Sequence, residues 1–134
     1  MANTKLTRTN GTSTNLKKWT WSAWIKRGII GTQETFVVSR YDDGNYSRIR
    51  TDPDVLQFED RFSSVTRTDI KSTEVLRDPN AWYHIVVRID YTQSSAADRA
   101  RMYVNGTEVT YSLTTRQSQD GNSYFNDSGP HALG

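Results

Sequence analysis

The stretch WTWSAWIK, residues 19–26, decides the fold because large apolar side chains recur in it at every second position. In an extended strand, alternate residues point to opposite faces of the sheet. One face carries the four apolar side chains of Trp19, Trp21, Ala23 and Ile25. The other face carries Thr20, Ser22, Trp24 and Lys26. The pattern predicts a β-strand whose first face, with Trp19 and Trp21, lies in the core, and it places Trp24 on the opposite face.

The same period of two continues along the chain and predicts further short strands. Two of them are ETFVVSRY, residues 34–41, and VLQFED, residues 55–60, in which Gln57 and Glu59 lie opposite the buried face. The inward side chains expected in these two strands are Phe36, Val38, Leu56 and Phe58. More strands are expected at residues 46–51, 65–70, 81–91, 101–104 and 107–111. In the segment 81–91, Trp82 is expected to be a core residue.

Turn residues separate these strands. DDGN, residues 42–45, is typical of a hairpin turn, and Asn105-Gly106 is the preferred pair for a two-residue type I′ turn. The segment 92–100 is long enough for a single helical turn, and residues 114–134 are expected to form a loop followed by the beginning of a last strand. Many short strands with almost no helical periodicity predict an all-β fold, an antiparallel two-sheet β-sandwich or jelly roll.

Composition excludes several classes of protein. The chain has 134 residues, the length of one domain, and no cysteine, which excludes disulfides, thiolate metal sites and a cysteine nucleophile. Its two histidines argue against a histidine zinc site, and we expect neither a secretory signal nor membrane insertion. The 17 Lys and Arg are interspersed with 15 Asp and Glu, so no nucleic-acid partner is expected. The arginines of RIR, residues 48–50, are expected on the solvent face of a strand.

Three ordered motifs resemble a known family. They are WTWSAWIKRG, DPNAWYHIVVRID and RMYVNGTEVT. Together they resemble the concanavalin A-like jelly rolls of the laminin G and pentraxin type, and above all the LamG-like domains of virion and tail proteins of marine bacteriophages. The likeness runs from Leu6 to Gly134 and implies one concanavalin A-like domain over residues 1–134. Lectins, adhesion modules, glycosidases and structural proteins share this fold, so it does not settle function.

The resemblance also implies a difference at the termini. Related domains usually have another strand before the segment matching KLTRT, and they continue past HALG into a final strand. We therefore expect that a terminal strand or two is lacking and that one sheet edge is open. An open edge is a template for another chain. Self-association or contact with other virion proteins by strand addition is the expected consequence.

Catalysis is not expected from the residues. Glycosidases of the superfamily resemble one another in an E-x-D-x-x-E strand that supplies the two carboxylates, and this string is missing from the sequence. Glu59 and Asp60 are adjacent, so on a strand they point to opposite faces. A glycoside hydrolase with unrecognised carboxylates remains the weaker alternative.

Aromatic and polar residues near turns suggest a glycan site instead. Sugars commonly stack on aromatic side chains while amides and carboxylates bind their hydroxyl groups. The candidate residues for such a site are Trp24, Tyr41, Asn45, Tyr46, Asn122 and Tyr124. For Trp24, packing within the protein is the competing interpretation.

The resemblance suggests one cofactor, calcium, since laminin G and pentraxin relatives often bind it through loop oxygens. The candidate ligands are Asp42, Asp43, Asn126 and Asp127. Turn formation explains the same residues without a metal.

The function expected from the sequence is a non-enzymatic structural and adhesion module of a virion or extracellular appendage, made in the cytoplasm, that contacts host-surface glycans. The rival hypothesis is a purely architectural subunit, such as a capsid decoration or a filament protein, that assembles through open sheet edges.

Overall fold

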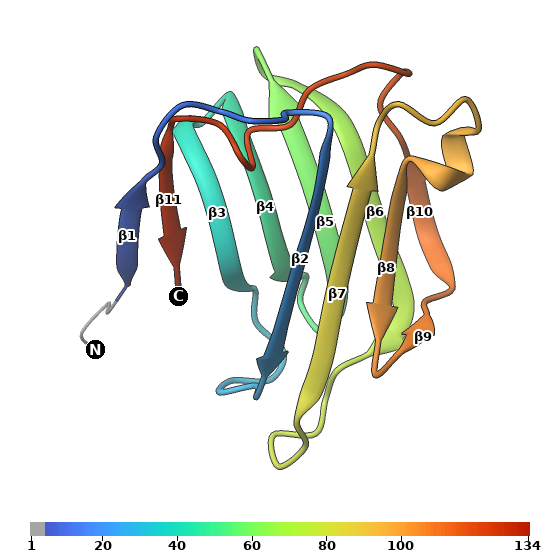
Figure 1. Cartoon of the computed structure of the whole chain (residues 1–134). Coiled ribbons are helices and arrows are strands. Elements are labelled where there is room, and N and C mark those ends of the chain that lie inside the picture. Colours follow the sequence, from blue (N-terminus) through green and yellow to red (C-terminus); the bar gives the residue numbers. More distant parts are fainter. Residues whose placement is uncertain (1–4) are drawn as a thin grey trace.

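The computed structural model describes residues 5–134 and shows two antiparallel sheets stacked face to face (Figure 1). The larger sheet has the strand order β1-β11-β3-β4-β5-β6-β10 and the smaller sheet the order β2-β7-β8-β9. The strands of the larger sheet are β1 (Leu6–Thr9), β3 (Glu34–Asp42), β4 (Asn45–Thr51), β5 (Val55–Phe62), β6 (Val65–Val75), β10 (Tyr111–Thr115) and β11 (Pro130–Leu133). Those of the smaller sheet are β2 (Lys18–Ile25), β7 (Tyr83–Asp90), β8 (Ala100–Val104) and β9 (Thr107–Glu108). The predicted all-β two-sheet sandwich is confirmed.

The core lies between the two sheets. Its fully buried side chains come from the inner faces of both and include Ile49, Leu56, Phe58, Ile70, Ile85, Val87 and Met102. The ring of Trp19 meets Phe58 and Phe125 edge-on, with centroids 5.3 Å and 4.9 Å away. Large aromatic side chains therefore compensate for the small number of apolar residues in the chain, because each of them buries a large area.

Strand β2 follows the alternation that the sequence predicts. Exposed and half-buried residues alternate from its first residue to its last, and Trp19, Trp21 and Ile25 face the core. Trp24 lies on the opposite face and is 65% exposed.

The expected parity fails in β3. A β-bulge between Thr35 and Val37 inserts one extra residue relative to β4. The side chains that follow, up to a second irregularity between Arg40 and Asp42, therefore change face. Val37 occupies the core, whereas Val38 lies on the outer face of the larger sheet, so the prediction that Val38 points inward is wrong. Phe36, at the bulge, packs partly against the core.

Two further details correct the sequence-based predictions. Trp82 precedes β7 and is 59% exposed, because it shares the outward face of His84, so its assignment to the core is wrong. Asn105 and Gly106 form the expected tight turn with φ of 51° and 83°. The second arm of this hairpin is shorter than predicted, since β9 ends at Glu108 and Tyr111 begins β10 in the other sheet.

The remaining elements are short. The expected helical turn is η1, a 3-10 turn at Ala96–Asp98, and the predicted last strand is β11. Strand β6 extends past the predicted segment 65–70 to Val75. Within residues 5–134, no helix has the length and apolar character required to cross a membrane.

Candidate functional site

Aromatic side chains gather at the end of the sandwich where the β3–β4 and β5–β6 turns meet the β10–β11 loop, at the top of Figure 1. The Tyr124 ring stacks on Phe62 with centroids 4.1 Å apart, and Tyr41 lies 5.1 Å from Tyr124. We call Tyr41, Asn45, Phe62, Tyr124 and Asp127 the rim cluster. It brings together three of the six side chains predicted for a glycan site, namely Tyr41, Asn45 and Tyr124.

Hydrogen bonds fix the polar groups of the rim cluster. The Tyr124 hydroxyl donates to Asn45 Oδ1 at 2.8 Å, and the Tyr41 hydroxyl donates to Asp127 Oδ2 at 3.1 Å. Partial burial, followed by the hydrogen bond and the charge of Asp127, raises the pKa of Tyr41. The tyrosines are therefore held neutral, with Tyr41 still 48% exposed at the rim.

Substituting Tyr124 tests how firmly the cluster is held. We expect Tyr124→Phe to lower the free energy of unfolding by about 1 kcal/mol, because it removes the hydrogen bond to Asn45 and leaves the stacking on Phe62 in place. Urea denaturation measures this difference. An unchanged free energy of unfolding would show that water replaces the bond without loss.

The other predicted glycan residues lie elsewhere. Tyr46 is buried on the outer face of the larger sheet, where its hydroxyl donates to Glu59 Oε1 at 2.9 Å. Trp24 belongs to the smaller sheet, with its ring centroid 5.0 Å from that of His84. Asn122 is exposed in the β10–β11 loop, and its carbonyl oxygen accepts a hydrogen bond from Gln117. The six predicted residues therefore do not form one site.

The calcium candidates are already bound to protein groups. Asp42 accepts hydrogen bonds from Asn45 Nδ2 and the Gly44 amide, which lower its pKa. Asp43 pairs with Arg40, and Asp127 accepts from Ser13 and Tyr41. The Asn126 amide donates to the carbonyl oxygen of Asn15. Within residues 5–134, no group of three or more His, Asp or Glu side chains is arranged to hold a metal ion, so the four candidates do not form a ligand set.

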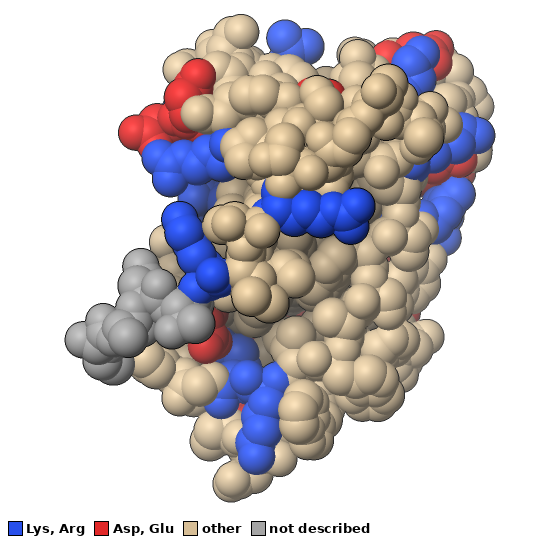
Figure 2. Space-filling model, turned by 60° about the vertical axis from the view of Figure 1, so that its left-hand side comes forward, with Lys and Arg blue, Asp and Glu red and all other residues tan. Residues whose placement is uncertain are grey.

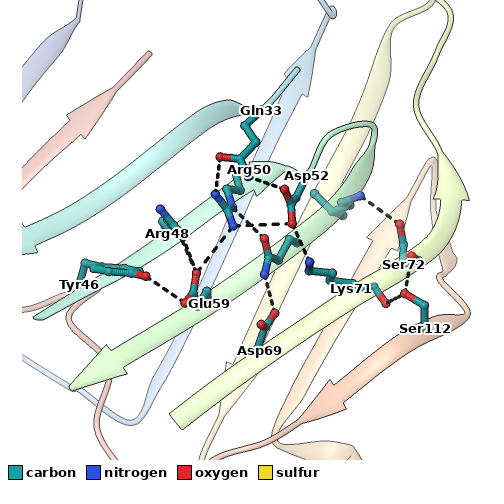
Figure 3. A network of polar contacts seen from close by, with 12 residues as sticks. Gln33, Tyr46, Arg48, Arg50, Asp52, Glu59, Asp69, Lys71, Ser72 and Ser112 are labelled. Atoms are coloured by element: carbon teal, nitrogen blue, oxygen red, sulfur yellow. Dashed lines mark hydrogen bonds and ion pairs between the residues drawn. The ribbon is translucent and has the colours of Figure 1, made fainter. Parts of the chain in front are cut away.

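A polar network covers the outer face of the larger sheet (Figure 3). At its centre, Glu59 accepts hydrogen bonds from Arg48 Nε and Nη2 at 3.0 Å and 2.7 Å, and from Tyr46. Arg50 donates to the side-chain oxygens of Gln57 and Gln33, and is itself buried. The expectation that the RIR arginines are simple solvent-facing residues is therefore wrong for Arg50.

Two carboxylates of this network are cross-strand neighbours. Glu59 on β5 pairs in register with Asp69 on β6. Asp69 accepts a hydrogen bond from Gln57 Nε2, while partial burial and then the nearby charge of Glu59 raise its pKa. Glu59 accepts hydrogen bonds from two nitrogens of Arg48 and from the Tyr46 hydroxyl, so both of its side-chain oxygens already have protein partners.

A groove of about 390 Å³ lies beside this network, on the outer face of β1, β11, β3 and β4. We call it the outer-face groove. Its apolar lining comes from Val38, Pro130 and Ala132, its neutral polar lining includes Thr7, Thr35 and Tyr46, and its cationic lining is Lys5, Arg40 and Arg48. The volume falls in the range of small-molecule sites. The guanidinium carbon of Arg48 lies 4.6 Å from the centroid of the Tyr46 ring, and the Arg48 side chain is 27% exposed.

Sequence reasoning missed this groove. Four segments from both ends of the chain line it, and the bulge in β3 puts Val38 there instead of in the core. The sequence does contain one signal of the polar network beside the groove. Charged or amide side chains occupy alternate positions in RIR, residues 48–50, and in QFE, residues 57–59. In antiparallel register these side chains meet on one face.

Comparison with known proteins agrees with this architecture. Residues 2–133 match the family described as the concanavalin A-like lectin/glucanases superfamily. No curated protein matches the chain. A match over nearly the whole length, together with the two antiparallel sheets of seven and four strands, confirms the resemblance to concanavalin A-like domains that the three motifs carry. The chain therefore belongs to the concanavalin A-like lectin/glucanase superfamily.

Proposed function

We propose that this chain is a non-enzymatic carbohydrate-binding module that provides adhesion as part of a virion or an extracellular appendage. The observation that carries the proposal is the outer-face groove, in which apolar Val38 and Ala132 lie among hydrogen-bonding side chains. A sugar ring presents apolar C–H groups as well as hydroxyls, so it requires such a mixed lining. The family of lectins and glucanases to which the chain belongs supports the same class of ligand.

The charge of the groove favours an acidic saccharide. Lys5, Arg40 and Arg48 line it, and Asp43 is the single carboxylate of the lining. Arg40 pairs with Asp43 and Arg48 with Glu59, so among the described residues Lys5 is the lining cation without an ion-pair partner, and an acidic ligand would share the two guanidinium groups with these carboxylates. Guanidinium groups bind carboxylate and sulfate oxygens with paired, charge-assisted hydrogen bonds. We therefore propose a saccharide that carries uronate or sulfate groups.

The outer-face network supports a binding role over hydrolysis. A retaining glycosidase requires one carboxylate that attacks the sugar and one that donates a proton. Glu59 directs its oxygens to Arg48 and Tyr46, and Asp69 is bonded to Gln57. Neither carboxylate is placed to reach a sugar without breaking this network.

A glycan array with neutral, uronate-bearing and sulfated oligosaccharides, followed by calorimetry, tests the proposal. We expect the acidic glycans to bind, and we expect Arg40→Ala to weaken that binding about tenfold through loss of a charged hydrogen bond. Arg67→Ala is the matched control, since Arg67 is an exposed arginine of β6 outside the groove lining. We expect this substitution to leave the affinity unchanged. Binding should also survive EDTA, because Asp42 and Asp127 already have protein partners.

Three results would count against the proposal. Absence of binding to every glycan at about 1 mM leaves the purely architectural role. An equal loss of affinity in Arg40→Ala and Arg67→Ala would show nonspecific attraction to a cationic surface. Hydrolysis of a β-glucan that Glu59→Gln abolishes would establish the glycosidase alternative.

A further inference from the structure

We infer that the free edge of β2 is a docking site for an extended acidic strand of another protein. The inference does not depend on carbohydrate binding, since it uses the opposite side of the β1–β11 region. It concerns the space between the two sheets, which we call the intersheet slot.

The first observation is an unpaired strand edge. Strand β2 pairs with β7 on one side, from Lys18 opposite Asp90 to Ile25 opposite Tyr83. On its other side no strand within residues 5–134 pairs with it. Alternate residues of this eight-residue strand thus direct their N–H and C=O groups to that edge. An edge of this length is a template for antiparallel or parallel pairing with a further strand.

The second observation is apolar surface beside that edge. The larger sheet has seven strands and the smaller sheet four, and in Figure 1 the smaller sheet leaves β1 and β11 uncovered. Leu6 and Leu133, which pair in register on these two strands, are 72% and 48% exposed. Under the middle of the smaller sheet, by contrast, Ile85 and Val87 of β7 are completely buried.

The slot has room for side chains of a docked strand. It measures about 350 Å³, and its apolar lining comes from Trp21, Ala23 and Ile25 of β2, Phe36 of β3 and Leu133 of β11. The inward side chains of a strand added to β2 would alternate with outward ones, so every second residue would enter the slot. The partner segment therefore carries apolar residues at alternate positions.

The charge around the slot indicates which outward side chains the partner strand carries. Arg8, Lys18 and Lys26 are exposed on the strands and loops beside it. Lys18 pairs with Asp90 at 3.7 Å, whereas no ion pair within residues 5–134 involves Arg8 or Lys26. Figure 2, with the β1 side turned forward, shows Lys and Arg outnumbering Asp and Glu there. Glu34, which lines the slot, is bonded to Arg27. A partner strand with acidic outward residues is complementary to this surface.

The same charges argue against a second copy of this chain. Two β2 strands in antiparallel pairing would place Lys18 of one copy beside Lys26 of the other at both ends of the contact. Like charges across a strand pair are destabilising. An acidic segment of a different protein is therefore the occupant that fits.

The test uses a synthetic probe of about seven residues, blocked at both ends, in which Val or Ile alternates with Glu. Titration into the full chain is followed by amide hydrogen exchange and by NMR. We expect saturable binding that protects the backbone amides of β2 from exchange. The amides of β10, an edge strand of the larger sheet, should not be protected. The same peptide methylated on alternate backbone nitrogens, and a version with Lys in place of Glu, should each bind at least about tenfold more weakly.

Matched variants separate docking from a general loss of stability. Leu133→Arg places a charge in the slot, whereas Leu113→Arg makes the same change at a comparably exposed leucine of β10. We expect only Leu133→Arg to weaken peptide binding, by about tenfold or more. No binding at about 1 mM peptide, or equal binding by the methylated peptide, overturns the inference. Concentration-dependent protection of β2 without any peptide overturns it in favour of self-pairing.

Discussion

Replacing Arg27 by methionine should lower the free energy of unfolding by about 3–5 kcal/mol. Arg27 lies two residues after the end of β2, and its side chain is fully buried. Its Nε donates to Glu34 at 2.6 Å, its Nη1 to the Leu76 carbonyl at 2.8 Å, and its Nη2 to the Ile29 carbonyl at 2.8 Å. Methionine fills similar volume but donates no hydrogen bond, so the buried Leu76 carbonyl and the buried Asp54 carboxylate lose their Arg27 partner.

The effect is expected to be large because Arg27 connects segments that are distant in sequence. The same guanidinium reaches the carbonyl of Pro53 and the carboxylate of Asp54, between β4 and β5. It thus joins the β2–β3 loop, the β4–β5 turn and the chain that follows β6. Arg27→Lys should recover only part of the stability, since an ammonium group cannot reach all three segments at once.

Arg77 provides the control for this prediction. It donates from Nε to the other oxygen of Asp54 at 2.9 Å, but its side chain is 64% exposed. Arg77→Ala should therefore cost less than about 1 kcal/mol. Urea denaturation of the three variants measures the differences. Similar costs for Arg27→Met and Arg77→Ala would mean that removing charge near Asp54, and not the buried hydrogen bonds, determines the loss.

Arg27 also illustrates what sequence patterns do not predict. The alternation in residues 19–26 predicts both the strand and its buried face because these depend on neighbouring residues alone. The partners of Arg27 come from three loops and from Glu34 at the start of β3, and no local sequence pattern reports how these segments meet. A buried arginine two residues after a strand therefore looks like an ordinary surface cation in the sequence.

The predicted burial of Val38 and Trp82 fails for two different reasons. The bulge between Thr35 and Val37 adds one residue to β3 and reverses the faces that follow. Trp82 has the size of a core residue but the parity of the outward face of β7. Size favours burial only where the strand also points the residue inward.

Only three of the six side chains predicted for a glycan site come together in the structure. Tyr41, Asn45 and Tyr124 meet in the rim cluster, as their positions next to turns predict, because the β3–β4 turn and the β10–β11 loop meet at one end of the sandwich. Tyr46 lies next to the same turn, yet its side chain points to the outer face and meets Glu59. The outer-face groove depends on β1 and β11 pairing across the whole length of the chain, and that contact has no local signal.

The second large effect is expected at Asp60, which lies inside the sandwich. Its carboxyl group is completely buried and receives hydrogen bonds from the hydroxyls of Ser47, Ser123 and Tyr91. Burial raises its pKa to about 7, because the surrounding low-dielectric interior disfavours the charged form more than the three hydroxyls stabilise it. The Tyr91 hydroxyl, also buried, has its pKa raised by burial and by the charge of Asp60.

The sign of the pH effect follows from this shift. An unfolded aspartate releases its proton near pH 3.8, whereas the native Asp60 keeps it up to about pH 7. Between these values the native state binds more protons than the unfolded state, so the contribution of Asp60 to stability falls as pH rises. Each unit of pKa difference corresponds to about 1.4 kcal/mol, so the free energy of unfolding loses a few kcal/mol across the window and levels off above it.

Asp60→Asn should remove this dependence, because the amide is neutral at every pH in the window and can still accept hydrogen bonds from Ser47 and Ser123. We expect the variant to be no more stable than the parent chain at pH 5 but more stable at pH 8, as measured by urea denaturation at both values. Asp120→Asn is the control: Asp120 is exposed and has a φ of 63°, which asparagine tolerates. Its difference from the parent should be the same at both pH values. If Asp60→Asn also gives a pH-independent difference, then Asp60 is ionised in the folded protein at both pH values, and the three hydroxyls outweigh its burial.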